Sequence, residues 1–302
     1  MSKVGVWNEL YRPTQLSEVI NLPQQLPSLV NDNLPHLLFH GVPGIGKTTT
    51  ARIIIRQLGA ECLELNASDE RGIETIRDKV KSFAASMSMN GKIKIIFLDE
   101  MDGLTPQAQE SLRNIIEKYH KFCRFVGSCN YINKIIEPLK SRFSLIEFKE
   151  PNKHHIESMC RDILEKQNII WRDDTVIDKI VNFSYPDIRK TINTLQTSVL
   201  DGCLNDNMIQ HQSDITNKLY GLIQLREFQE IRKTLVDETI NCNQVILDLE
   251  DKIFNDETLS TEAKKKIIIE IGHSNRMINM VAIPRIELEY LILKILELNK
   301  DE

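Results

Sequence analysis

The sequence predicts an α/β fold in which a parallel sheet is covered by helices on both faces and is followed by two helical domains. Within residues 36–148, short apolar segments alternate with longer segments of helical periodicity, which is typical of strands joined by crossover helices. The pattern changes at Glu150-Pro151-Asn152, because later segments carry helical periodicity alone. A polar segment at 201–214 interrupts this helical part. We therefore expect domains at 1–150, 151–211 and 212–302.

The elements of the first domain follow one another in a regular order. A buried strand over 36–40 leads into a glycine-rich turn and then into a helix over 49–58, which ends at Gly59. Further strands are expected at 61–65, 93–98, 123–128 and 145–148, and further helices at 73–87, 106–118 and 135–141. A parallel sheet of this kind binds ligands at the carboxyl ends of its strands. Later helices are expected at 153–167, 174–183 and 187–200.

The glycine-rich turn carries the most specific chemistry. Residues 41–48 read Gly-Val-Pro-Gly-Ile-Gly-Lys-Thr, the pattern of a loop whose backbone N–H groups converge on phosphate at the start of a helix. Lys47 is expected to reach the β- and γ-phosphates of ATP, and the Thr48 hydroxyl to hold Mg²⁺. A surface Gly-Pro turn would explain the glycines but not the Lys-Thr pair. The predicted nucleotide-binding residues of this segment are Gly41, Val42, Pro43, Gly44, Ile45, Gly46, Lys47, Thr48 and Thr49.

A pair of carboxylates ends the strand at 93–98. Asp99 is expected to hold Mg²⁺, and Glu100 to orient and deprotonate the attacking water. A solvated strand end is the alternative, since Asp-Glu pairs are common there. The phosphate loop upstream favours the catalytic interpretation, because two parts of the phosphoryl-transfer template then agree.

Composition restricts the class of protein. A chain of 302 residues with 41% hydrophobic content suits two or three domains with ample core. The net charge of −5 argues against coating nucleic acid through overall charge, although a local basic face remains possible. No apolar run approaches the ~20 residues that span a bilayer, and the first residues lack a secretion segment. We expect an intracellular protein with no membrane partner, whose six scattered cysteines are packing residues.

Five ordered motifs resemble those of replication factor C small subunits, the sliding-clamp loaders of eukaryotes, archaea and some large DNA viruses. They are Trp7-Asn8-Glu9-Leu10-Tyr11-Arg12-Pro13, Leu63-Glu64-Leu65-Asn66-Ala67-Ser68-Asp69-Glu70-Arg71-Gly72, Glu117-Lys118-Tyr119, Cys129-Asn130-Tyr131 and Pro138-Leu139-Lys140-Ser141-Arg142. The resemblance covers most of the chain. It implies an AAA+ ATPase, in which residues 151–211 form a helical lid and residues 212–302 a collar that holds a five-membered ring together.

The resemblance also assigns roles to single residues. Asn130 matches the residue that senses the γ-phosphate, and Arg189 matches a lid arginine that reports bound nucleotide. Arg12 and Ile20 match the segment that closes over adenine. Arg142 matches an arginine finger, which acts in trans on the ATP of the neighbouring subunit. A surface amide, surface charges and ordinary core are the alternatives in the absence of the family match.

Some positions depart from the family pattern. Phe143 stands where the family usually has Cys after the finger, so the packing of the finger is expected to differ while its arginine is kept. Val42 and Ile45 stand where Pro and Thr are frequent. Those positions contribute mainly backbone, so nucleotide binding is expected to be retained.

The expected partners are other clamp-loader subunits, a sliding clamp and primer–template DNA. Arg77 and Lys81 lie four residues apart, on one helical face, and match family positions that track DNA phosphates. A solvated face paired with Glu74 or Asp78 is the alternative. The site of action is expected to be the nucleus of a eukaryote or the replication site of a virus. Two other functions stay open: a ring subunit that binds ATP without hydrolysing it, and a different AAA+ remodeller.

Overall fold

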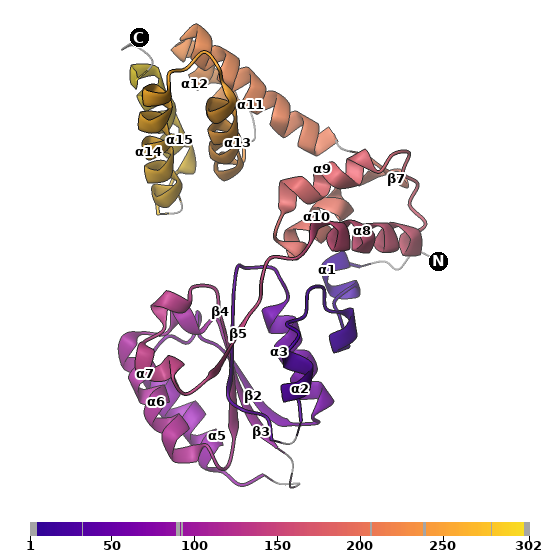
Figure 1. Cartoon of the computed structure of the whole chain (residues 1–302), viewed down its shortest axis with the longest axis vertical. Coiled ribbons are helices and arrows are strands. Elements are labelled where there is room, and N and C mark those ends of the chain that lie inside the picture. The colour runs from indigo at the N-terminus through magenta and orange to yellow at the C-terminus, as the bar shows by residue number, and fades with distance from the viewer. Residues whose placement is uncertain are drawn as a thin grey trace. The chain divides into compact units, whose positions relative to one another are not determined.

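A computed structural model of the chain divides into two compact units, Met1–Asn205 and Asp206–Glu302 (Figure 1). The structure describes residues 5–31, 33–88, 91, 93–205, 207–237, 240–278 and 280–298, without the side chains of 75, 207–213 and 237. The expected domain boundary at 150 lies within the first unit, and the division of that unit into two domains stays a prediction.

A five-stranded parallel sheet forms the centre of the first unit. Its strands are β1 (Leu37–His40), β2 (Glu61–Asn66), β3 (Lys94–Asp99), β4 (Arg124–Cys129) and β5 (Ser144–Glu147), in the order β2-β3-β4-β1-β5. In the register, Leu37 of β1 lies between Val126 of β4 and Ser144 of β5. The predicted fold class is therefore confirmed. Strand β1 pairs on both edges, so the loop that follows it emerges between two neighbouring strands.

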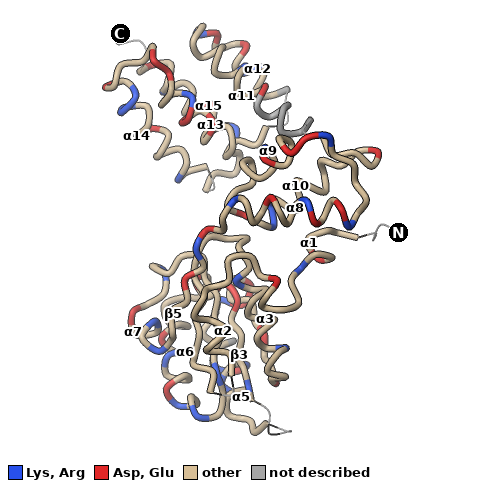
Figure 2. The backbone as a smooth tube through the Cα atoms, turned by 45° about the vertical axis from the view of Figure 1, so that its right-hand side comes forward, with Lys and Arg blue, Asp and Glu red and all other residues tan. Residues whose placement is uncertain are grey.

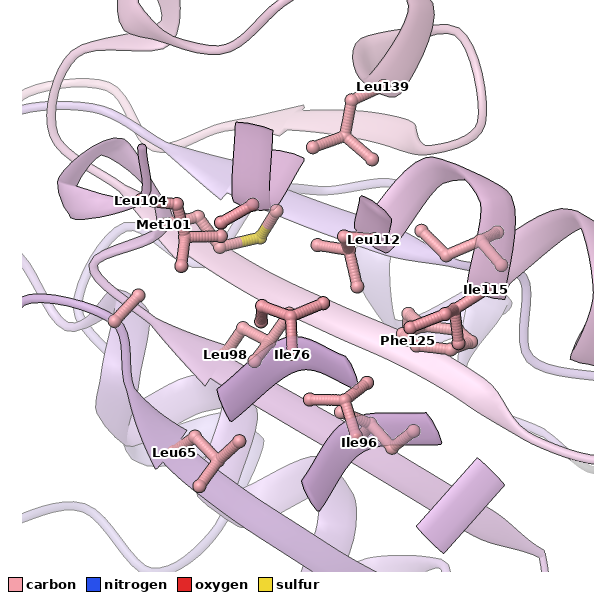
Figure 3. Close-up of a cluster of buried hydrophobic side chains, with 14 of the residues drawn as sticks. Leu65, Ile76, Ile96, Leu98, Met101, Leu104, Leu112, Ile115, Phe125 and Leu139 are labelled. Atoms are coloured by element: carbon pink, nitrogen blue, oxygen red, sulfur yellow. The ribbon is translucent and has the colours of Figure 1, made fainter. Parts of the chain in front are cut away.

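Alternate residues of the strands face two separate hydrophobic cores. Leu37 and Phe39 of β1 belong to the core that includes Ile54 of α3 (Lys47–Gln57). Leu38 belongs to the other core, which includes Leu112 of α6 (Pro106–Tyr119) and is drawn in Figure 3. Burying one such side chain contributes about 1.5–3 kcal/mol to the stability of the fold, relative to leaving it exposed to water. Figure 1 shows α3 on one face of the sheet, with α5 and α6 on the opposite face.

Shorter elements complete this part of the unit. They are α1 (Trp7–Leu10), η1 (Leu16–Glu18), α2 (Leu26–Leu29), α4 (Ile73–Thr75), a π-helical turn η2 (Ile76–Val80), α5 (Lys81–Ala85), η3 (Met101–Gly103), η4 (Ile132–Lys134) and α7 (Glu137–Lys140). The helix predicted at 73–87 is observed as a continuous helical segment over 73–85. Its hydrogen-bond pattern changes from α to π at Ile76 and returns to α at Lys81. The start of α6 follows its sequence signals, because Thr105 Oγ1 accepts from Ala108 N at 3.2 Å and Pro106 occupies the first turn.

Three helices and a short hairpin follow the sheet in the first unit. They are α8 (Lys153–Gln167), α9 (Thr175–Ser184), α10 (Ile188–Thr197), β6 (Val199–Leu200) and β7 (Cys203–Leu204). The antiparallel hairpin was not predicted, because two-residue strands carry no periodicity that a sequence pattern can reveal. The amino-terminal segment packs here, since Gln196 Oε1 accepts from Trp7 N at 2.9 Å.

The second unit is helical. It contains α11 (Asn207–Leu225), α12 (Phe228–Asp237), α13 (Cys242–Asn255), α14 (Thr261–Met277) and α15 (Pro284–Leu298) around a core of its own. The expectation of a polar interruption at 201–214 was wrong in part, because α11 begins at Asn207. Polarity reports exposure and not backbone conformation, and residues such as Gln and Met have good helix propensity. Within the described residues, no helix has the length and apolar character needed to cross a membrane.

Candidate nucleotide-binding site

The predicted phosphate loop joins the carboxyl end of β1 to the start of α3. Two of its glycines leave no room for a side chain. A Cβ at Gly41 would lie 2.3 Å from the Phe148 carbonyl oxygen, and one at Gly44 would lie 1.9 Å from Asp187 Oδ1. Both residues also have positive φ values, 145° and 76°. Pro43 is exposed, Val42 and Thr49 are half-buried, and Ile45 is anchored in the core against the sheet.

Lys47 is the first residue of α3 and is only 6% exposed. Its Nζ donates to the carbonyl oxygens of Gly41 and Val42, both at 2.7 Å, and to Asn130 Oδ1 at 2.8 Å. Burial lowers the pKa of Lys47 to about 8. The ammonium group is therefore bonded both to the backbone of the phosphate loop and to Asn130, the residue predicted to sense the γ-phosphate.

Thr48 and Asp99 meet at the same edge of the sheet. Thr48 Oγ1 donates to Asp99 Oδ1 at 2.9 Å, and the hydroxyl of Ser128 donates to the same oxygen. A hydroxyl and a carboxylate are hard oxygen ligands of the kind that Mg²⁺ takes when nucleotide phosphates supply the remaining ligands. The pair therefore fits a magnesium site that is completed by bound nucleotide.

Glu100 follows the end of β3 with an unusual backbone. Its φ and ψ are 57° and 45°, in the left-handed region that favours glycine. Its N–H donates to Ser128 Oγ at 3.1 Å, and its side chain is half-buried. This turn directs the chain out of the sheet immediately after Asp99, so both carboxylates emerge at the carboxyl edge.

Asn130 lies one residue beyond β4, and the backbone around it is held by a residue that the sequence analysis did not single out. Asp102 accepts from Asn130 N at 3.4 Å and from Tyr131 N at 3.2 Å. The only sequence signal for Asp102 is its place in the acidic run that follows β3. Ser128 gave no signal of its own, because its role depends on the pairing of β4 with β3.

The start of α10 also approaches the phosphate loop. Asp187 caps this helix by accepting from Lys190 N at 2.8 Å, and its carboxylate packs against Gly44. Arg189 is exposed in the first turn of α10. Asp187 was not predicted, because its contact with the loop joins segments far apart in the chain.

The two residues predicted to close over adenine lie in the amino-terminal segment. Arg12 forms an ion pair with Glu9, with Nη2 and Oε1 at 2.8 Å. Ile20 is half-buried, and the side chain of Val19 beside it lies 3.8 Å from the position that a Cβ at Gly46 would occupy. The segment that contains Ile20 therefore lies close to the phosphate loop.

Arg142 lies at the opposite end of the sheet from the phosphate loop. It precedes β5, whereas the loop follows β1, and these neighbouring strands are parallel. A four-residue strand spans about 13 Å, so the two ends are well separated. Arg142 is exposed and forms an ion pair with Glu117 of α6, and its Nη1 donates to Ser141 Oγ at 2.8 Å.

Arg77 and Lys81 lie on the helix that follows the edge strand β2, and both are exposed. In this helix the ion pair found among the described residues joins Lys79 to Glu70 at 2.7 Å, and neither Glu74 nor Asp78 pairs with the two candidate DNA residues. Figure 2 shows basic and acidic residues interspersed along the chain. Any DNA contact therefore depends on local positions and not on a uniformly basic surface.

Comparison with known proteins identifies the family. The model of the ATPase family associated with various cellular activities (AAA) matches residues 37–151. The replication factor C small subunit of Methanococcus maripaludis is 36% identical over 95% of this chain and 97% of its own, and that of Archaeoglobus fulgidus is 35% identical over 96% of each. A similar fold occurs in Thermotoga maritima RuvB, with a TM-score of 0.56 and 19% identity over 76% of this chain and 86% of that one. On these matches the chain belongs to the replication factor C small subunit family of AAA ATPases.

Proposed function

We propose that this chain is the ATPase subunit of a sliding-clamp loader, which opens a sliding clamp and loads it onto primer–template DNA during DNA replication. One observation carries the proposal. Lys47 with Asn130, and Thr48 with Asp99, form two hydrogen-bonded pairs at the carboxyl ends of three neighbouring strands. That arrangement places a cation, an amide and a pair of oxygen ligands suited to Mg²⁺ around one phosphate loop. The names of the replication factor C relatives support the same role.

In ATP hydrolysis, each of these side chains has a separate role. Lys47 neutralises the β- and γ-phosphates, Glu100 orients and deprotonates the attacking water, and Asn130 contacts the γ-phosphate through its amide. Mg²⁺, when held by Thr48 and Asp99, supplies positive charge to the phosphate oxygens. Arg189 reports bound nucleotide from α10, and Arg12 and Ile20 close over the adenine. The contact between Asp187 and Gly44 supports a role for the start of α10 near the phosphates.

Arg142 acts on the ATP of a neighbouring subunit in a five-membered ring. Its place at the amino end of β5 supports action in trans, because the chain's own phosphate loop is at the other end of the sheet. Its ion pair with Glu117 lies on an exposed surface, where a neighbour's triphosphate can compete for the guanidinium. The replacement of the usual Cys by Phe143 is compatible with this role, since Phe143 is buried in the core that includes Leu112 and leaves Arg142 exposed.

The division of labour between domains is part of the same proposal. Residues 1–150 bind nucleotide, residues 151–211 form the lid and residues 212–302 form the collar. Leu291, Ile292, Ile295 and Leu296 of α15 are buried in the second unit's own core. Ile286, Tyr290 and Leu293 recur at helical spacing on the exposed face of α15. We assign this exposed face to contacts with neighbouring collar domains.

The other partners are DNA and the clamp. Arg77 and Lys81 are proposed to track phosphates of one DNA strand without reading its sequence, and residues 106–117 to contact the clamp. The archaeal relatives support an intracellular DNA-replication protein, whereas nothing in them favours the nuclear or viral locations that the sequence left open.

The test is ATP turnover by reconstituted rings that carry Glu100→Gln in this chain alone. We expect turnover from this subunit to be lost while nucleotide still binds, because the amide keeps the shape of the side chain but cannot accept the proton. Glu165→Gln, on the exposed face of α8, is the matched control and should change neither quantity.

Two outcomes would favour the other functions. Unchanged turnover in Glu100→Gln rings would assign the chain to the class of ring subunits that bind ATP without hydrolysing it. Normal turnover that a clamp does not stimulate, with no clamp loaded on DNA, would favour a different AAA+ remodeller.

A further inference from the structure

Ser128 of β4, two residues before Asn130, contacts the carboxylate of Asp99 and the backbone of Glu100. Its hydroxyl accepts from Glu100 N at 3.1 Å and donates to Asp99 Oδ1. Asp99 Oδ1 also accepts from Thr48 Oγ1 at 2.9 Å. A continuous chain of hydrogen bonds therefore runs from the backbone of Glu100 through Ser128 to the oxygen that Thr48 also contacts. Each bond in such a chain polarises the next.

The contact matters most at Glu100, because its backbone is strained. A non-glycine residue in the left-handed region costs about 1–2 kcal/mol and persists only where its surroundings hold it there. The N–H of Glu100 has Ser128 Oγ as its partner. If that acceptor is removed, the strained turn loses the bond that compensates it, and the direction of the Glu100 side chain is no longer fixed.

Ser128 is itself held in a fixed position. It is 2% exposed in β4, and it follows Gly127, which pairs with Leu98 in the parallel register. A Cβ at Gly127 would lie 2.1 Å from Met101 Sδ, so this part of β4 is packed directly against the turn after β3. The backbone that carries the hydroxyl is therefore held beside Asp99 and Glu100 by the packing of β4.

We propose that Ser128 is a positioning residue for ATP hydrolysis, which acts by holding Glu100 in a fixed position relative to Asp99 and to Asn130, which follows the end of β4. The inference rests on the proposed function, in which Glu100 directs the attacking water. It assigns to Ser128 an effect on the chemical step and not on nucleotide binding, since its hydroxyl contacts the Asp99 carboxylate and the Glu100 N–H and not the phosphate loop.

Ser128→Ala is the first test, in reconstituted rings that carry the change in this chain. We expect kcat from this subunit to fall about 10- to 100-fold, because small displacements of a catalytic group are costly. The Kd of the isolated chain for a fluorescent ATP analogue should stay within about threefold, since the change removes no phosphate contact. Ser128→Thr keeps the hydroxyl and should restore most of the rate. Ser184→Ala removes another buried hydroxyl, which bonds Thr194 in the helical part of the unit, and should leave both quantities unchanged.

The double variant Glu100→Gln, Ser128→Ala shows whether Ser128 acts through Glu100. If it does, the double variant is no slower than Glu100→Gln alone. Normal kcat in Ser128→Ala, or losses that multiply in the double variant, would overturn the inference. A parallel loss of nucleotide affinity would also overturn it, because the role would then be structural. If Glu100→Gln itself has no effect, the proposed function fails first, and the two failures are therefore distinguishable.

Discussion

The two ends of the central sheet differ in how complete they are within a single chain. At the carboxyl end, Lys47 bonds Asn130 and Thr48 bonds Asp99, so one chain supplies all of these side chains to the site. At the amino end, Arg142 is exposed and bonds the side chains of Glu117 and Ser141. A group of bonded side chains can bind a ligand within one chain, whereas an exposed guanidinium can bind an anion that a second chain brings to it.

The largest expected effect is at the amino end. In reconstituted rings, Arg142→Ala should lower hydrolysis at the neighbour's site by about 10³ to 10⁵, because a guanidinium supplied in trans neutralises charge that develops in the transition state. Nucleotide binding by the chain that carries the change should be unaffected. Single-turnover hydrolysis and the Kd for ATP measure the two quantities separately.

Two controls sharpen the Arg142 prediction. Arg142→Lys keeps the charge but not the planar fork, and should recover only part of the rate. Lys140→Ala removes a cation two residues away that is already paired with Glu137, and should change little. A loss of turnover in the isolated chain equal to that in the ring would show that Arg142 acts within its own chain.

The next largest effect is at the carboxyl end. Lys47→Met should weaken ATP binding about 10- to 100-fold, since a charge-assisted hydrogen bond contributes about 1.5–3 kcal/mol. Equilibrium titration of the isolated chain with a fluorescent ATP analogue measures the change. Arg56→Met, at the other end of the same helix, is the matched control, and an equal loss of affinity there would contradict a specific role for Lys47.

The residues proposed to contact nucleotide at the carboxyl end of the sheet were easier to predict from sequence than the residues that position them. The phosphate loop and the acidic pair were predictable because their chemistry requires particular residue types at short spacing, and the structure brings Lys47, Thr48 and Asp99 together. Ser128 and Asp187 were not predictable, because their contacts depend on strand register and on packing between distant segments. The same reason explains why the left-handed turn at Glu100 was missed.

The fold was predicted correctly because alternation between strands and helices is written in local periodicity. The start of α11 was not, since a polar composition does not decide between an exposed helix and a loop. The roles of Arg12, Ile20 and Arg189 stay predictions from resemblance. The predicted role of each is a contact with bound nucleotide, which the local sequence does not encode.

The pH dependence of binding probes the carboxyl end without changing its shape. Burial lowers the pKa of Lys47 to about 8, so the ammonium form is lost as pH rises through 8. A bound triphosphate favours the ammonium form and raises that pKa, so binding at pH 8 should take up about half a proton per nucleotide. Affinity should decline as pH rises above 8. Calorimetry in two buffers of different ionisation enthalpy measures the uptake.

Lys47→Arg is the control for proton uptake. Its guanidinium stays charged throughout this pH range, so both the uptake and the decline in affinity should disappear. Uptake that persists in Lys47→Arg would identify a different titrating group.

The smallest expected effect concerns a third surface, which belongs to neither end. Replacing Arg77 and Lys81 together by Ala should lower the slope of log affinity against log salt by about 1.8 for duplex DNA, because each phosphate contact contributes about 0.9. The loss should be the same for every DNA sequence, since phosphate contacts carry no base information. Titration of the reconstituted loader with fluorescent primer–template DNA over a range of salt concentrations gives the slope. Lys79→Ala removes a like charge from the same helix. Because Lys79 is paired with Glu70, the salt slope of this variant should equal that of the unchanged loader. An equal change in the two variants would mean that the helix contributes only its net charge, and that Arg77 and Lys81 hold no defined phosphate contacts.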